Sequence, residues 1–201
     1  MSEENFERPD QSIMDEAKAL LKAAEYCADY HLCKKMRERA LMLLAPFVER
    51  KVPEALYLNL FRPYDPSKYS DEELDRLFLS LLREAAEAGS IEAKFRLACE
   101  LDENKTREEA SALFKEAAEA GHAYAMWCHG LNLYGGTGLV QDKEKGIDFI
   151  RKSAELKFEG AIRFIAEAYA KGVYGFSKDE VESTKWWKKL ADKDLISING
   201  Y

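Results

Sequence analysis

The chain has 201 residues, of which 47% are hydrophobic, and a formal net charge of −7. This length fits one compact domain or a short repeat array, and the apolar content is enough to bury a core, which excludes disorder along the whole chain. Because the basic residues are interleaved with acidic ones, no basic field attracts phosphates, and the sequence predicts no nucleic-acid partner.

The sequence predicts neither targeting nor membrane insertion. Residues 1–5 are acidic and lead into no apolar stretch, so we expect no secretory signal and a mature protein that starts near Met1. The longest apolar run, Ala40 to Val48, contains Pro46 and is far shorter than the roughly 20 residues needed to cross a bilayer. The cysteines do not recur at one position of the repeat described below, so we expect free thiols and a cytoplasmic location.

The N-terminal quarter of the chain predicts one helix pair. Residues 1–11 are polar, and we expect a disordered or frayed N-terminus there. Residues 12–51 form a helix pair, which is either a degenerate repeat or a cap.

Cys27, His31 and Cys33 in this pair are of the residue types that hold zinc. Cys27 and His31 stand four residues apart and would share a helix face, with Cys33 near enough to join them. No fourth ligand follows at the usual spacing, and the first helix should end near Tyr30. Buried structural cysteines are commoner, so we predict no metal and no cofactor, and a metal-dependent regulator stays a minor alternative.

An internal repeat governs the rest of the chain. Glu-Ala-Ala-Glu-Ala-Gly occurs at 84–89 and at 116–121, and degraded copies follow at 152–157 and 189–194. A period of this length is typical of stacked helix hairpins, each too small to bury its apolar face alone. With residues 12–51 the chain would hold about five antiparallel helix pairs, of which the last four are 52–89, 90–121, 122–157 and 158–194.

The pair at 122–157 shows the pattern most clearly. Its first helix is predicted at Ala123–Tyr134 and its second at Lys143–Leu156, with a glycine-rich segment at 135–138 between them. This segment follows a helix rather than a strand and lacks the Lys and Ser/Thr of a P-loop, so it predicts a hairpin and not a phosphate cradle.

Residues of this pair and of the next resemble the SEL-one-like repeat family, a branch of the tetratricopeptide-like superfamily. The matching positions are Ala125, Gly130, 134–138, Asp142, Lys145, Gly146, Phe149, 152–155, Ala161, Tyr169, Gly172, Gly175, Trp186, Trp187, Lys189 and Ala191. The resemblance implies an all-α fold, an α-solenoid that winds into a right-handed superhelix.

The sequence also departs from the family pattern. Residues 102–105 shorten one hairpin toward the tetratricopeptide form, and residues 62–66 replace the glycine hairpin of the preceding pair. Lys157 and Asp194 stand where the family has a closing glycine. The C-terminal tail, 195–201, alternates apolar and polar residues and is predicted to lie extended over the last pair, although its ordering is left open.

No catalytic constellation can be recognised. Cys128 and His129 are adjacent on a helix, so their side chains diverge by about 100° and cannot act as a nucleophile and its base. His129 occupies the position that holds Leu97 and Ile165 in the neighbouring pairs, which predicts a core histidine. We therefore predict that the protein is not an enzyme.

Aromatic residues suggest a binding face. Positions two and six residues after the first Ala of each first helix should face away from the second helix, toward the concave wall of the array. Together with two flanking tyrosines they form the predicted partner-binding set: Tyr57, Phe61, Phe95, Cys99, Tyr124, Trp127, Leu131, Tyr134, Arg163 and Glu167. Such a stripe also serves core packing, and both interpretations stay open at this point.

The resemblance implies a protein-binding or peptide-binding adaptor or scaffold, or a bacterial immunity protein that neutralises a toxin. The alternative is an enzyme related to the cysteine-rich, secreted members described as weak β-lactam hydrolases, but this chain lacks their signal peptide and paired cysteines. We expect another protein or a peptide as the partner, no membrane span, and a monomer in preference to an oligomer.

Overall fold

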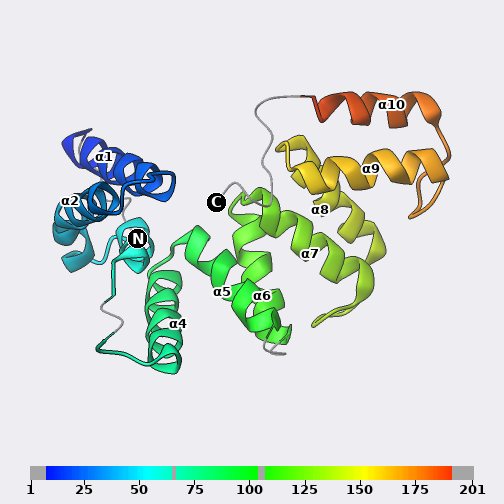
Figure 1. Ribbon diagram of the computed structural model, residues 1–201. Coiled ribbons are helices and arrows are strands. Elements are labelled where there is room, and N and C mark those ends of the chain that lie inside the picture. The colour runs from blue at the N-terminus through cyan, green and yellow to red at the C-terminus, as the bar shows by residue number, and fades with distance from the viewer. Residues whose placement is uncertain (1–7, 65–66, 104–106, 192–201) are drawn as a thin grey trace. The chain divides into compact units, whose positions relative to one another are not determined.

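The structure is a computed structural model that describes residues 8–64, 67–103 and 107–191 of the chain (Figure 1). The chain forms two compact units, residues 1–93 and 94–201, and each is considered by itself. Within the described ranges every regular element is a helix, which confirms the predicted all-α repeat fold. No helix of these ranges is both long enough and apolar enough to span a membrane.

The first unit is built from helices that fold back on one another. They are α1 (Arg8–Glu25), α2 (Tyr30–Glu49), α3 (Pro53–Leu58), a short 3-10 helix η1 (Asn59–Phe61) and α4 (Asp71–Glu87). Helices α1 and α2 pack side by side, and the apolar residues between them join Ala55 of α3 in one core. The buried members of that core are Met14, Ala17, Leu21, Ala40, Leu44, Phe47 and Ala55.

The second unit begins within α5 (Ile91–Glu103). It continues with α6 (Arg107–Glu119), α7 (Ala123–Gly135), α8 (Lys143–Glu155), α9 (Glu159–Lys171) and α10 (Glu180–Lys189). Each of α6, α7, α8 and α9 packs against the helix that follows it in the chain. One core of this unit contains Ala123, Ile150, Ala154, Phe158, Ala161, Ile162, Ile165, Ala168 and Phe176.

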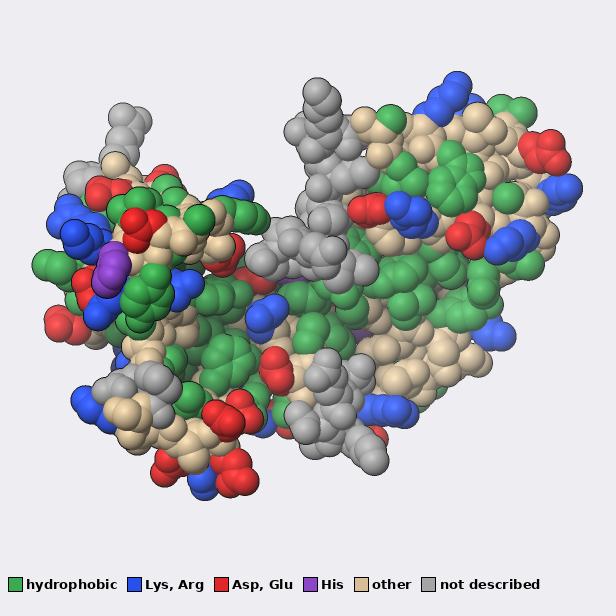
Figure 2. Space-filling model, in the orientation of Figure 1, with side chains coloured by type: hydrophobic (Ala, Val, Ile, Leu, Met, Phe, Trp, Pro, Cys, Tyr) green, Lys and Arg blue, Asp and Glu red, His purple; other side chains and the backbone are tan. Residues whose placement is uncertain are grey.

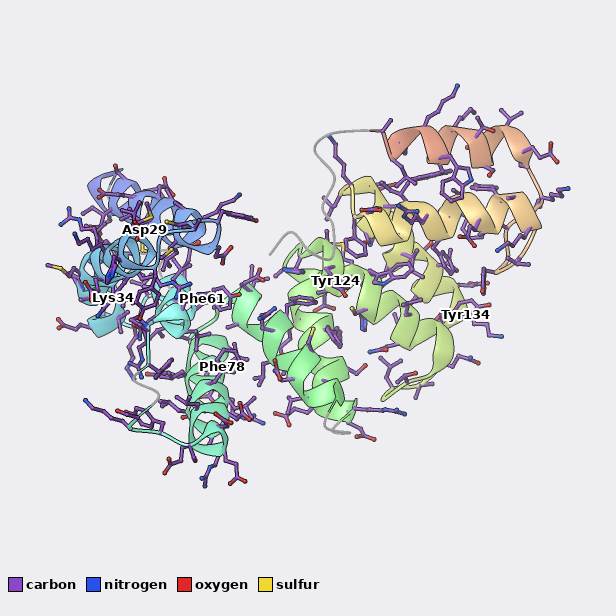
Figure 3. All side chains as sticks on the ribbon, in the orientation of Figure 1. Asp29, Lys34, Phe61, Phe78, Tyr124 and Tyr134 are labelled. Atoms are coloured by element: carbon purple, nitrogen blue, oxygen red, sulfur yellow. The ribbon has the colours of Figure 1, made fainter. Side chains whose placement is uncertain are left out.

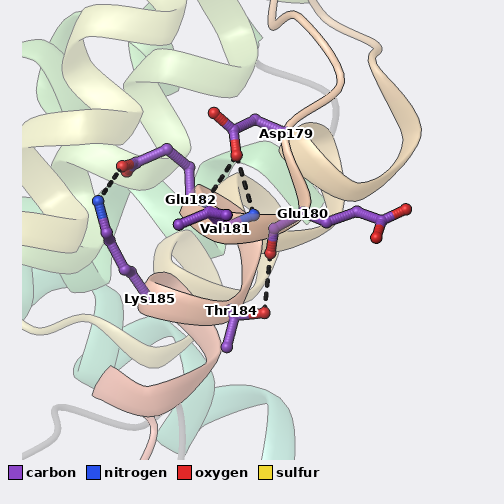
Figure 4. Close-up of polar contacts among 6 residues, drawn as sticks. All are labelled: Asp179, Glu180, Val181, Glu182, Thr184 and Lys185. Carbon is purple, nitrogen blue, oxygen red and sulfur yellow. Dashed lines mark hydrogen bonds and ion pairs between the residues drawn. The ribbon is translucent and has the colours of Figure 1, made fainter.

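Aspartates and a serine begin several of the helices by accepting backbone hydrogen bonds. Asp179 Oδ1 accepts from Val181 N and from Glu182 N, both at 2.9 Å (Figure 4). Asp142 accepts from Lys145 N at 3.1 Å, which is the main reason that the pKa of Asp142 lies below its ordinary value. These carboxylates satisfy amide groups that a helix leaves unpaired in its first turn.

The repeats close with one recurring turn. Ser90 N donates to Ala85 O and Gly89 N to Ala86 O, both at 3.0 Å, which is the Schellman pattern of a helix C-terminus. The same two bonds recur 32 and 68 residues further along, with His122 and Phe158 in place of Ser90.

The same turn also closes α2, where the sequence showed no family motif. Val52 N donates to Phe47 O and Lys51 N to Val48 O, and Lys51 has a left-handed backbone with φ of 56°. Lys157 adopts the same conformation with φ of 66° in the later turn. Residues up to Lys51 therefore end as a repeat does, although a lysine stands where glycine is favoured.

Small residues stand three positions after each closing turn, on the first helix of every repeat. Ala55, Ala93, Ala125 and Ala161 are all 0% exposed. These buried alanines permit close contact between helices, because only small side chains allow such close helix packing.

Two expectations for the N-terminal pair are wrong. Helix α1 ends at Glu25 and not near Tyr30, which instead begins α2, so Cys27 lies in the turn and shares no helix face with His31. The turn is tied by Cys33 Sγ, which donates to Cys27 O at 2.9 Å. Residues 8–11, predicted to be frayed, belong to α1, whereas residues 1–7 and the tail at 195–201 lie outside the described residues.

Candidate protein-binding surface

Phe95, one of the predicted surface residues, is buried between repeats. Its side chain is 2% exposed, and its ring lies 4.4 Å from that of His122 and 4.9 Å from that of Tyr124, centroid to centroid. Both neighbours belong to the following repeat. Phe95 therefore stabilises the stack and presents no surface to a partner.

Trp127 occupies the same position in the next repeat and is half-buried for the same reason. Its ring contacts Phe158 at 6.0 Å and Phe164 at 5.6 Å, both from the repeat that follows. Arg163, which occupies this position in the repeat after that, is exposed. This position thus faces the next repeat, and a charged residue holds it in the last repeat that the described residues contain.

The other predicted residues differ in exposure. Leu131 is 37% exposed, whereas Cys99, Tyr124 and Tyr134 are half-buried, and Figure 3 shows the two tyrosines toward opposite ends of α7. In the first unit Tyr57 is half-buried and Phe61 is 39% exposed, and their rings meet edge to face at 5.6 Å. The predicted set is therefore divided between the two units and between surface and core.

A pocket on the second unit collects three of the predicted residues, Tyr134, Arg163 and Glu167. We call it the α9 pocket; its volume is about 590 Å³. The full lining is Tyr134, Gly160, Arg163, Phe164, Glu167, Lys171, Val173 and Tyr174. In Figure 2 hydrophobic side chains gather over α7, beside acidic and basic side chains toward α9.

The apolar wall of the α9 pocket is a row of touching rings. Phe164 and Tyr174 lie 4.8 Å apart, and Tyr174 meets Tyr134 edge to face at 5.6 Å. Tyr174 is 46% exposed and Val173 beside it is 37% exposed. Phe164 and Tyr174 escaped sequence reasoning because neither lies at the two helix positions chosen for the concave face.

The charged side chains of the pocket are paired along α9. Arg163 Nε donates to Glu159 Oε1 at 3.0 Å, and Lys171 Nζ donates to Glu167 Oε2 at 2.7 Å. The hydrogen bond that Lys171 donates to Glu167 raises the pKa of Lys171 above its ordinary value. Each charge at the rim therefore already has a partner on its own helix, one turn away.

A second pocket of about 510 Å³, the α8 pocket, shares Tyr134 and Tyr174 with the first. Its other lining residues are Lys143, Glu144, Ile147, Asp148, Arg151 and Gly175. Lys143 Nζ lies 5.6 Å from the centroid of the Tyr134 ring. The two tyrosines thus form a common wall between neighbouring pockets.

The histidine that sequence reasoning placed in the core is indeed buried. His129 is 4% exposed and meets Phe149 edge to face at 4.8 Å. Burial is the main cause that lowers the pKa of His129, and the charge of Lys115 lowers it further. The α9 pocket, in turn, offers an aromatic wall and charges paired on one helix, an arrangement that suits the binding of a side chain.

No protein-family model matches the sequence. A Sel1 repeat protein from Oxalobacter formigenes superposes with a TM-score of 0.64 at 24% identity, over 88% of this chain and 69% of that one. A protective antigen of uropathogenic Escherichia coli strains that displays an SLR fold superposes with a TM-score of 0.60 at 20% identity. That match covers 92% of this chain but only 38% of the antigen, so the chain spans well under half of its length.

Cysteine rich protein B of Helicobacter pylori also matches, with a TM-score of 0.42 at 14% identity over 78% of this chain and 97% of that one. The first two superpositions agree with the recurring closing turns and the buried alanine row described above. The chain therefore has the fold of the Sel1-like repeat proteins, as its sequence predicted.

Proposed function

We propose that the chain is a protein-interaction scaffold that binds a peptide segment of a partner protein at the α9 pocket. The observation that carries the proposal is the row of Phe164, Tyr174 and Tyr134 rings beside a pocket of about 590 Å³. Pockets that hold ligands commonly have this size and are mostly apolar with a few polar groups. Half-exposed aromatic residues are also the usual anchors of protein interfaces.

The α9 pocket is lined by a face of α9 that the repeat stack covers only in part, because Phe164 packs on Trp127 whereas Glu167 and Lys171 are exposed. Phe95 and Trp127 show that one side of each first helix is used for packing against the next repeat. Gly160, Phe164, Glu167 and Lys171 of α9 line the pocket and recur at helical spacing. An adaptor function needs no further chemistry than this face provides, whereas the toxin-neutralising role stays a prediction.

A matched pair of substitutions tests the proposal. Val173→Asp places a carboxylate in the wall of the α9 pocket, while Val140→Asp makes the same change at a side chain that is 89% exposed and lines neither pocket. Peptides would be selected from a displayed random library on the full wild-type chain and then synthesised. Their dissociation constants would be measured for the wild type and for both variants.

We expect the Val140→Asp variant to bind the selected peptides as the wild type does, and the Val173→Asp variant to bind at least about tenfold more weakly. A tenfold loss corresponds to about 1.4 kcal/mol, the scale of one buried apolar contact made unfavourable. Equal affinity of both variants, or a library that yields no binding peptide, would contradict the proposal.

A further inference from the structure

Tyr174 stands where the preceding repeat has a glycine. Gly136 and Gly172 both end a first helix with a left-handed backbone, at φ of 73° and 67°. Two residues later come Gly138 with φ of 68° and Tyr174 with φ of 58°. The second hairpin therefore keeps the left-handed backbone of the glycine hairpin at these two positions, with a bulky side chain at the second of them.

A left-handed backbone is unfavourable for any residue with a Cβ and is rare for a large one. In the hairpin after α7, glycine is needed at position 138, because a Cβ there would lie 2.4 Å from Arg107 O. The second hairpin has no need of glycine for space, since the tyrosine fits. A conformation of this kind persists where the surrounding structure holds it, and such residues cluster at binding sites.

The position of the Tyr174 ring indicates its function. Tyr174 lines both the α9 pocket and the α8 pocket, and it touches Phe164 on one side and Tyr134 on the other. Nearly half of its surface is open to solvent. Removing the ring would join the two pockets and take away the central part of the aromatic wall.

The charges and the remaining wall of the α9 pocket indicate the chemistry of its occupant. Arg163 and Lys171 are neutralised by Glu159 and Glu167, so the pocket does not require an ionic group from a ligand. Its remaining wall is aromatic and aliphatic. Aromatic rings pair favourably with other rings in edge-to-face or offset geometry, beyond the area that they bury.

We propose that Tyr174 is the specificity-determining residue of this surface and that the α9 pocket takes an aromatic side chain of the partner peptide. This inference rests on the proposed function and adds the chemistry of the occupant. It concerns one side chain and the chemistry of the occupant, so it can fail while peptide binding at the α9 pocket stands.

The probes are N-acetyl amides of tryptophan, lysine and glutamate, titrated to high millimolar concentration into the isotope-labelled full chain. Amide chemical shifts are the readout. We expect the tryptophan probe to shift the amides of Phe164 and Tyr174 saturably and the two charged probes to leave them unchanged.

The variants separate recognition from structure. Tyr174→Phe keeps the ring and should bind the tryptophan probe as the wild type does. Tyr174→Gly should weaken its binding at least about tenfold, while relief of the left-handed backbone keeps the thermal midpoint near or above that of the wild type. Tyr26→Ala removes a tyrosine that is 78% exposed in the first unit and should change neither value.

The inference is overturned if the charged probes bind as well as the tryptophan probe, if no probe shifts these amides, or if Tyr174→Gly binds normally. A Tyr174→Gly variant whose midpoint collapses would also overturn it, because the ring would then serve packing. Library peptides that depend on Val173 but lack aromatic residues and ignore Tyr174→Gly would remove this inference and leave the proposed function standing.

Discussion

Gly130 of α7 and Gly146 of α8 approach each other so closely that neither position has room for a methyl group. A Cβ on Gly130 would lie 2.8 Å from Gly146 O, and a Cβ on Gly146 would lie 2.7 Å from Gly130 O. Both obstacles are backbone atoms, which cannot rotate away. The two glycines therefore set the distance between α7 and α8.

Replacing Gly130 by alanine should destabilise the protein by about 1 to 3 kcal/mol, the usual cost of overpacking. At an exposed helix position the same change would stabilise the protein by about 1 kcal/mol, so the expected change in unfolding free energy has the opposite sign here. Urea unfolding of the full chain measures the effect. Gly135→Ala is the control, because the added methyl group meets only Thr137 Oγ1 at 3.4 Å, and it should leave stability unchanged or higher. A Gly130→Ala variant as stable as the wild type would show that the two helices can separate at little cost.

His129 should make the stability of the protein depend on pH. Its pKa in the folded state is lowered, mainly by burial, whereas in the unfolded chain it is near 6.5. The unfolded chain therefore binds a proton first, and stability is lost as the pH falls below about 6.5, until the folded pKa is reached. Lys115 adds to this lowering and Glu119 opposes it.

His129→Leu tests the prediction, since Leu97 and Ile165 hold the same position in neighbouring repeats and are 3% and 1% exposed. We expect the variant to lose most of the decline in thermal midpoint between pH 7 and pH 5. His31→Leu makes the same change at an exposed histidine and should keep the wild-type profile. If both variants keep the decline, groups other than His129 cause it.

The closing turn at Lys157 should gain stability from glycine. Lys157 has a left-handed backbone, with φ of 66°, at the position that Gly89 and Gly121 occupy in earlier turns. Lys157→Gly should raise the unfolding free energy by about 1 kcal/mol, because glycine takes this conformation without steric cost. Lys152→Gly, the same change within α8, should lower it by about 1 kcal/mol. The thermal midpoints of the two variants should therefore shift in opposite directions. Shifts of the same sign would contradict the left-handed backbone at Lys157.

Trp127 should behave as a packing residue and not as an exposed anchor. Because its ring touches Phe158 and Phe164, Trp127→Ala should cost about 3 kcal/mol of stability. Leu131→Ala, one turn further along α7 at a side chain that is 37% exposed, should cost well under half of that. A Trp127→Ala variant whose thermal midpoint barely changes would contradict the packing role and favour Trp127 as part of the binding surface.

The fold was accessible from the sequence because repetition reveals it. The period, the alanine row and the aspartates that begin α8 and α10 each depend on residue type at a fixed spacing. Asp142 and the glycines near 136 were predicted correctly on that basis. The end of α1 at Glu25 was not, since no proline or glycine marks it, and Asp29, four residues later, caps the start of α2.

The binding surface was only partly accessible. Helix geometry selected Arg163 and Glu167, which line the α9 pocket. It also selected Phe95, because the position along the helix does not show that this side packs on the next repeat and is buried. Tyr174 was not predicted because its proposed role depends on a left-handed hairpin backbone, a conformation for which the sequence leads one to expect glycine. A comparison of the two hairpins at fixed offset from Gly136 and Gly172 would have shown the substitution.

The most direct test of the central claim is hydrogen exchange of the full chain with and without a peptide selected on it. Peptide binding at the α9 pocket should slow amide exchange in the hairpin that follows α9, around Val173 and Tyr174, and at the end of α7 near Tyr134. Exchange in α1 and α2 should not change. Protection that falls on the first unit, with none at Val173 and Tyr174, would contradict a peptide-binding site at this pocket.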